Sequence, residues 1–110
     1  MNGAVYLLIA IVGEVIATSF LRASAGFTQI GPSIIVVLGY CVTFYFFSLA
    51  LQTIPVGVGY AIWSGVGIVL ISLAAFLMYG QTLDLPAIIG IAMILAGVLV
   101  INLFSDSAPH

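Results

Sequence analysis

The chain has 110 residues, of which 65% are hydrophobic and 4% are charged, and its formal net charge is −2. A soluble domain has about a quarter of its residues charged, so this composition excludes a water-soluble protein and predicts an integral membrane protein. Arg22 is the one basic residue other than a histidine, which leaves no footprint for nucleic acid. The lone Cys41 can form neither an intramolecular disulfide nor a metal site. We therefore expect no enzymatic site, metal or cofactor.

Four long apolar stretches, at about 4–21, 33–51, 56–79 and 85–104, are separated by short polar connections. A helix of about 18 residues rises about 27 Å, close to the roughly 30 Å hydrocarbon core of a bilayer. Pro32 and Pro86 suit the first turns of their helices, and Asp84 suits an N-cap. The sequence thus predicts an all-α membrane protein with a single four-helix transmembrane domain over residues 1–110.

The first stretch carries one carboxylate, Glu14, near its midpoint. An ionised residue at the centre of a membrane helix costs about 2.5–3.5 kcal/mol unless it faces a wet cavity, finds a partner or takes a proton. Desolvation disfavours the charged form, so Glu14 is expected to exchange between a proton and a cationic partner. The two ligands then compete for one group, and competition couples proton entry to cation exit if the site opens to one side at a time.

Helical spacing predicts which side chains share a chamber with Glu14. Aromatic walls and one carboxylate suit a hydrophobic cation, although core packing or interfacial anchoring is the commoner role of any single aromatic residue. The candidate chamber residues are Leu7, Ala10, Ile11, Ala17, Thr18, Tyr40, Thr43, Phe44, Tyr60 and Trp63.

A chain of four spans is too small to enclose a pathway and also shield Glu14 from lipid. We therefore expect a homodimer that brings two copies of Glu14 into one chamber, where they titrate as a coupled pair. The expected partners are a small cationic substrate, protons, membrane lipid and a second copy of the chain.

Glycines mark two further features. Gly65 and Gly67 predict either a bend in the third helix or simply tight helix packing. Gly90 and Gly97 are seven residues apart and so lie on one face of the fourth helix, which predicts a helix contact within or between chains. The tail ends in His110, which is expected to be a solvated residue with no catalytic role.

Four spans place both termini on one side of the membrane, whereas Arg22 and Asp84 lie on the other. Orientation normally follows the bias of lysine and arginine between loops, and here that bias is a single arginine. The sequence allows one weakly preferred orientation or a mixture of both, and the mixture would permit an antiparallel dimer.

Several motifs resemble the small multidrug resistance family along the whole chain. They are Glu14-Val15-Ile16-Ala17-Thr18, Gly26-Phe27-Thr28, Pro32-Ser33, Ile54-Pro55, the long run from Tyr60 to Ser72, Gly80-Gln81, the run from Leu83 to Gly90, and Ala96-Gly97-Val98-Leu99. The resemblance implies a multi-pass antiporter of the bacterial inner membrane, an antiparallel homodimer with dual topology that exchanges protons for polyaromatic and quaternary ammonium cations in multidrug efflux.

The resemblance also implies roles for single residues. In the family the acid matching Glu14 binds both proton and substrate, and residues matching Tyr40, Tyr60 and Trp63 line the chamber. The glycines matching Gly90 and Gly97 lie on a dimerising helix, and the segment matching Gly65 to Gly67 is a kink.

The sequence departs from the family pattern at several positions. Gln29, Thr82 and Asp106 stand where basic residues are expected, and Ala17 stands where glycine is frequent, which adds a methyl group near the acid. Tyr40 favours the drug-exporting branch over the guanidinium-exporting branch.

Three alternatives remain on sequence grounds. The first is a guanidinium exporter of the same fold. The second is a proton-carrying rotor subunit, which is usually a two-helix hairpin and has no need of Tyr40, Tyr60 and Trp63. The third is a structural assembly subunit, in which Glu14→Gln would leave function intact.

Overall fold

A computed structural model describes residues 2–106 of the chain as four helices: α1 (Gly3–Leu21), α2 (Ile30–Ala50), α3 (Val56–Tyr79) and α4 (Leu85–Phe104). Each helix is long and apolar enough to cross a membrane, which confirms the predicted all-helical architecture. α2 begins before the expected position 33, so that Pro32 lies in its first turn, where a missing N–H leaves no helical bond unmade. His110 lies outside the described residues.

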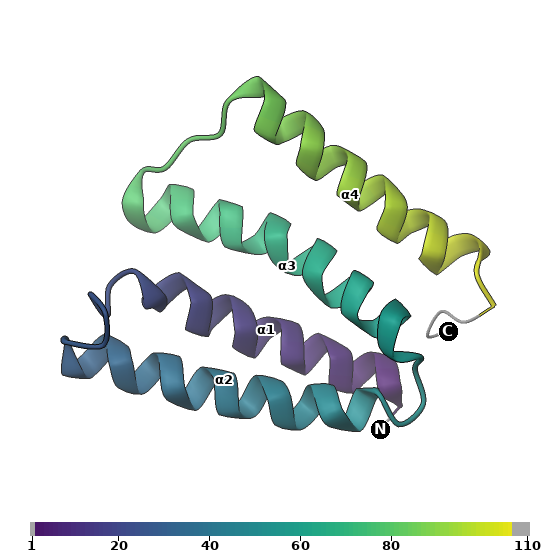
Figure 1. Ribbon diagram of the computed structural model, residues 1–110, viewed down its shortest axis with the longest axis horizontal. Coiled ribbons are helices and arrows are strands. Elements are labelled where there is room, and N and C mark those ends of the chain that lie inside the picture. Colours follow the sequence, from purple (N-terminus) through teal and green to yellow (C-terminus); the bar gives the residue numbers. More distant parts are fainter. Residues whose placement is uncertain (1, 107–110) are drawn as a thin grey trace.

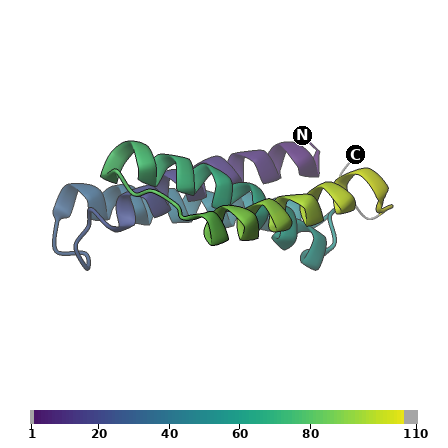
Figure 2. The ribbon, with the colours of Figure 1, turned by 90° about the horizontal axis from the view of Figure 1, so that it is seen from above.

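The helices form a flat slab that measures 44 × 35 × 17 Å along its principal axes (Figures 1 and 2). α1 and α2 lie side by side, α3 packs along α1, and α4 lies beyond α3. The start of α1 and the α2–α3 turn are at one end of the slab, and the other two connections are at the opposite end (Figure 1). This order leaves α4 at the margin of the chain.

Local signals set the helix ends. The Asn2 side chain accepts a hydrogen bond from the Val5 N–H at 3.0 Å, and the predicted N-cap Asp84 accepts one from the Ala87 N–H at 3.1 Å. Gly80 ends α3 with φ of +66°, a left-handed conformation that suits glycine, and its N–H donates to the Phe76 carbonyl.

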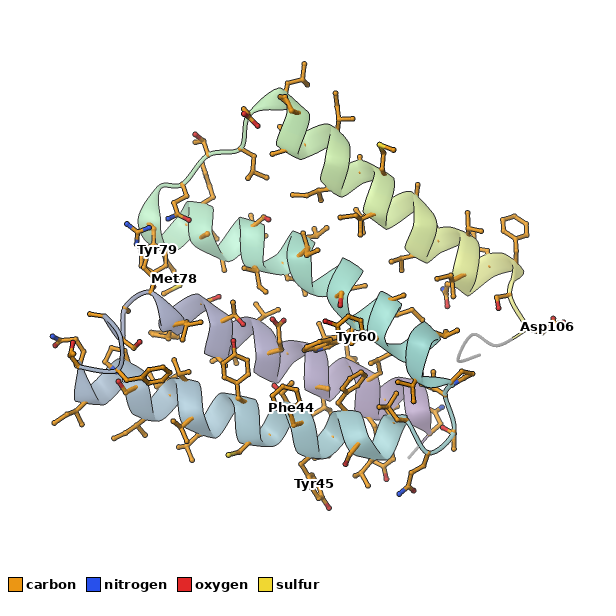
Figure 3. All side chains as sticks on the ribbon, in the orientation of Figure 1. Phe44, Tyr45, Tyr60, Met78, Tyr79 and Asp106 are labelled. Carbon is orange, nitrogen blue, oxygen red and sulfur yellow. The ribbon has the colours of Figure 1, made fainter. Side chains whose placement is uncertain are left out.

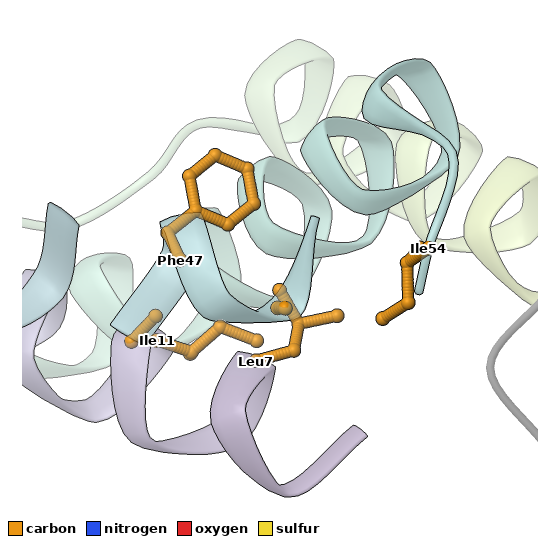
Figure 4. Close-up of a cluster of buried hydrophobic side chains, with 6 residues drawn as sticks. Leu7, Ile11, Phe47 and Ile54 are labelled. Atoms are coloured by element: carbon orange, nitrogen blue, oxygen red, sulfur yellow. The ribbon is translucent and has the colours of Figure 1, made fainter. Parts of the chain in front are cut away.

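The core lies between α1, α2 and the turn that leads into α3 (Figure 4). Its buried side chains are Leu7, Ala10, Ile11, Phe47, Ala50 and Ile54. Further along the same two helices the backbones approach closely at the α1–α2 seam, which we define as Gly13, Ala17, Gly39 and Thr43. A Cβ placed on Gly39 would lie 2.8 Å from the Ala17 Cβ, so only glycine fits there.

The far ends of α1 and α3 are joined by a polar contact. The Tyr79 hydroxyl donates to the Ser19 carbonyl at 2.6 Å, and the Arg22 guanidinium lies 5.4 Å from the centre of the Tyr79 ring. The Ser19 carbonyl is one of the last four backbone carbonyls of α1, which receive no hydrogen bond from an N–H of the same helix. Tyr79 therefore supplies the missing donor.

α4 makes its close contact through Val98, which packs where Gly65 of α3 has no side chain. Val98 is the one buried residue of α4. The rest of the helix presents large apolar side chains outward, among them Met93 and Leu103. Such a surface suits lipid or another protein chain.

Candidate functional site

Glu14 lies in the middle of α1, half-buried, on the side that faces α3. Its Oε1 accepts a hydrogen bond from the Thr18 hydroxyl, one turn along the helix, at 2.9 Å. The Thr18 hydroxyl in turn lies 2.6 Å from the Tyr40 hydroxyl of α2. One carboxylate oxygen is therefore held by a short chain of two hydroxyl groups.

The second carboxylate oxygen, Oε2, is buried and has no hydrogen-bond partner within residues 2–106. It lies against Gly67 of α3, where an added Cβ would be 3.0 Å away. A buried carboxylate oxygen without a partner is unfavourable, since its desolvation is not compensated by a hydrogen bond. A proton or a cation at this oxygen would relieve that cost.

A pocket of about 260 Å³ opens beside the carboxylate. We name it the Glu14 pocket, and it is lined by Glu14, Tyr60, Trp63, Ser64, Gly67, Ile68 and Ile71. All of its lining residues come from α1 and α3. A larger hollow of about 580 Å³ between α1 and α2 is lined only by aliphatic residues and glycine, so it offers no group that would bind a charge.

Aromatic rings connect the Glu14 pocket to α2. The Trp63 ring stacks on Phe47 with centroids 5.1 Å apart, and the Tyr60 ring meets Trp63 edge-on at 5.3 Å. The centroid of the Phe44 ring lies 6.3 Å from that of Trp63 and 6.0 Å from that of Tyr40. Phe44 and Tyr60 occupy the middle of the molecule, whereas Tyr45 points away from it (Figure 3). Rings in this arrangement present π-faces and edges that suit an aromatic or cationic guest.

The structure brings some of the predicted chamber residues together. Tyr60 and Trp63 line the Glu14 pocket, Thr18 and Tyr40 reach the carboxylate through hydrogen bonds, and Phe44 belongs to the aromatic group. The Trp63 indole N–H is buried and has no hydrogen-bond partner among the described residues, so it too is available to a ligand or water.

Other predicted chamber residues lie elsewhere. Leu7, Ala10 and Ile11 belong to the core between the helices. Ala17 and Thr43 are fully buried in the α1–α2 seam, where the Thr43 hydroxyl donates to the Gly39 carbonyl at 2.8 Å. The extra methyl group of Ala17 thus contacts Gly39 and does not narrow the Glu14 pocket.

The pocket also contains residues that the sequence reasoning did not single out. Ser64, Ile68 and Ile71 recur with Tyr60 and Gly67 at steps of three and four, which is one face of α3. Extending the Tyr60 face by helical spacing would have found them. Gly67, for which a bend or tight helix packing is expected, is the residue of α3 that makes room for the carboxylate.

The glycine pair on α4 has a different setting. A Cβ added to Gly90 or to Gly97 would have no neighbour within 4 Å. Neither glycine therefore serves a helix contact within the described part of this chain.

Comparison with known proteins agrees with the site. Residues 2–94 match the sequence model of the family described as Small Multidrug Resistance protein. Over 110 residues, and the full length of both chains, the protein is 53% identical to the quaternary ammonium compound-resistance protein QacE of Escherichia coli and 54% identical to the multidrug transporter EmrE of E. coli K12. It is 42% identical to the multidrug resistance protein EbrB of Bacillus subtilis, over 93% of this chain and 87% of that one.

The family model matches most of the sequence, and full-length relatives are more than half identical to it. These matches exclude a rotor subunit or an assembly subunit of another family. The four apolar helices agree in number and length with a protein that crosses the membrane several times. The chain therefore belongs to the small multidrug resistance family and is a multi-pass transporter of the bacterial inner membrane, not an enzyme.

Proposed function

We propose that this chain is a proton-coupled antiporter that exports lipophilic, aromatic and quaternary ammonium cations. Glu14 binds the cation and the proton in turn. The observation that carries the proposal is the Glu14 carboxylate itself: one oxygen is held by Thr18, and the other is buried beside an aromatic pocket with no hydrogen-bond partner among residues 2–106. A cation or a proton at that oxygen neutralises a charge in a medium of low dielectric constant.

The chemistry of the pocket supports an organic cation as substrate. Tyr60 and Trp63 supply ring faces that attract a cation, and Ile68 and Ile71 supply apolar contact. Two relatives are named for quaternary ammonium compounds and for multidrug transport, which fits a guest that is both charged and apolar. The pocket of one chain, with walls from two helices, would be completed by a second chain.

The second chain is expected to be an identical copy in the opposite orientation. Support comes from α4, where Gly90 and Gly97 have open space beside them and most large side chains are exposed. Small residues that let helix backbones approach are typical of membrane helix contacts. Support for the antiparallel arrangement comes from Arg22, because a single basic residue gives the chain little preference for either orientation.

Proton release tests the role of Glu14. Adding tetraphenylphosphonium to detergent-solubilised protein should release protons into a weakly buffered solution, and cation affinity should fall as the pH falls, because the two ligands compete for one carboxylate. Glu14→Gln should abolish both the proton release and the pH dependence of cation affinity. Asp106→Asn, which removes an exposed carboxylate at the other end of the chain, should change neither. Release that persists in Glu14→Gln would mean that another group carries the proton.

Competition binding separates the two branches of the family. If the pocket takes lipophilic cations, guanidinium should displace bound tetraphenylphosphonium only at much higher concentration. Tight guanidinium binding with weak tetraphenylphosphonium binding would instead assign the chain to guanidinium export.

A further inference from the structure

The two hydroxyl groups beside Glu14 form a chain with a definite direction. The Thr18 hydroxyl has one hydrogen, and at 2.9 Å from Oε1 it donates that hydrogen to the carboxylate. An ionised carboxylate can only accept, so the hydrogen in the 2.6 Å contact between Thr18 and Tyr40 must come from Tyr40. The order of donation is Tyr40 to Thr18 to Glu14.

This use of a threonine hydroxyl differs from the usual one in a helix. Thr43 donates to the carbonyl four residues earlier on its own helix, at Gly39, which is the common arrangement. Thr18 also bonds to the residue four positions earlier, but to the Glu14 side chain. Its hydrogen is thereby committed to the carboxylate, and its oxygen is left to accept from α2.

We propose that Thr18 is a positioning residue that holds the ionised Glu14 carboxylate with Oε1 engaged and Oε2 turned to the pocket, and that links the ionisation of Glu14 to the orientation of the Tyr40 hydroxyl. The inference rests on the proposed function, since it assumes that Glu14 loses and regains a proton during transport. It adds a role for Thr18 that follows from the direction of donation.

Protonation of Glu14 reverses the direction of donation along these hydrogen bonds. A neutral carboxyl group becomes a donor, Thr18 accepts from it, and the Thr18 hydrogen turns to the Tyr40 oxygen. The Tyr40 oxygen then accepts a hydrogen bond from Thr18, and the Tyr40 O–H is free to donate to a different acceptor. Tyr40 lies 6.0 Å from Phe44, which contacts Trp63, so the change reaches the aromatic wall where a cation would bind.

Few other polar groups surround Glu14. Tyr40 faces it from α2 through Thr18, and Tyr60 and Ser64 share its pocket from α3. Arg22 is about two helical turns away on α1 and stacks on Tyr79. Asp84 and Asp106 flank the two ends of α4. The Thr18 hydroxyl is therefore the one group recorded as donating to the carboxylate within residues 2–106.

The test measures tetraphenylphosphonium affinity against pH in the full-length protein. Thr18→Val keeps the shape of the side chain and removes the donor, so the pH midpoint of binding should rise by about one unit, given the usual strength of a hydrogen bond to a charged group. Thr18→Ser should restore the wild-type midpoint. Thr28→Val, in an exposed loop, is the matched control and should leave the midpoint unchanged.

A double-mutant cycle tests the link to α2. Tyr40→Phe should raise the pH midpoint of binding by about half a unit in the wild type. It should add nothing in the Thr18→Val background, because the hydrogen bond between Thr18 and Tyr40 is already absent there. Tyr45→Phe, which removes an exposed hydroxyl from the same helix, is the matched control. Additive effects of Thr18→Val and Tyr40→Phe would overturn the link.

Two other results would overturn the role of Thr18 itself. One is an affinity that falls by the same factor at every pH in Thr18→Val, and the other is a shifted midpoint that Thr18→Ser does not restore. If Thr18→Val does not fold, an unmoved midpoint in Tyr40→Phe has the same meaning. The proposed function fails separately, when Glu14→Gln still releases protons.

Discussion

At the scale of single residues, the setting of Glu14 depends on what its neighbours lack as much as on what they provide. Thr18 provides one hydrogen bond, and Gly67 provides space by having no side chain. The unpaired oxygen fits against α3 because a glycine stands there. A cation that binds in the Glu14 pocket can then approach the oxygen from the Tyr60 and Trp63 side.

Gly67→Ala tests this fit. The added Cβ would lie 3.0 Å from Oε2, which forces the end of the glutamate side chain to move and leaves the backbone in place. We expect tetraphenylphosphonium affinity to fall by about tenfold, which corresponds to a strain of about 1.4 kcal/mol, with little loss of stability in denaturant titrations. Gly57→Ala, where the Cβ meets open space, is the control and should bind normally. Unchanged affinity in Gly67→Ala would show that the carboxylate does not need this position.

At the scale of elements, α1 and α2 form the best-packed pair, and the α1–α2 seam sets their separation. A Cβ on Gly13 would lie 2.7 Å from the Thr43 hydroxyl oxygen, and a Cβ on Gly39 would meet Ala17. Because Tyr40 follows Gly39 on α2, the seam also fixes the height at which Tyr40 meets Thr18. Close packing of this pair thus supports the polar contacts of the site.

Gly39→Ala should destabilise the protein by about 1–3 kcal/mol, because two methyl groups cannot occupy the seam at 2.8 Å and the helices must separate. The measurement is unfolding by denaturant in detergent. Ala17→Gly should recover much of the loss in the double variant, since it removes the opposing methyl group. Destabilisation that Ala17→Gly leaves untouched would place the strain elsewhere in α2.

Tyr79→Phe tests the contact that joins the far ends of α1 and α3. It removes the hydrogen bond to the Ser19 carbonyl and keeps the ring beneath Arg22, so stability should fall by about 0.5–1.5 kcal/mol. Tyr45→Phe, whose side chain is 61% exposed, should have almost no effect in the same unfolding experiment. Equal effects of the two substitutions would mean that the Tyr79 hydroxyl adds no stability.

At the scale of the whole molecule, the chain is a thin slab with an almost unpartnered fourth helix. A slab of this shape leaves the Glu14 pocket with walls from two helices, so the transporter is expected to need a second copy. The distribution of charge matters at the same scale, because Arg22 as a single basic residue gives the chain only a weak preference for one orientation.

Adding one lysine to a loop should fix the orientation. Gln29→Lys adds a positive charge on the side of Arg22, and Gln52→Lys combined with Arg22→Gln places the basic residue on the opposite side; both glutamines are exposed. Each variant alone should lose resistance to quaternary ammonium compounds in growing cells, because all copies insert the same way. Co-expression of the two variants should restore it. Full resistance from either variant alone would contradict an antiparallel dimer.

The fold class and the importance of Glu14 follow from the amino-acid sequence. In hydrocarbon every backbone polar group must be satisfied within the segment, so apolar stretches of this length can only be helices, and a lone carboxylate among them must have a use. The N-cap of α4 at Asp84 also follows from the sequence, because its side chain accepts a hydrogen bond from a backbone N–H three residues later. These conclusions depend on composition and on contacts within a few residues.

Which face of each helix meets which neighbour depends on tertiary packing. The helices are apolar on all sides, so hydropathy does not specify their rotation. For that reason helical spacing alone predicts chamber positions for Leu7, Ala10, Ile11, Ala17 and Thr43, and within this chain they lie in the core and the α1–α2 seam. The packing of glycine against neighbouring side chains set the rotation, and with it the contact of Thr18 with Tyr40 and of Glu14 with Gly67.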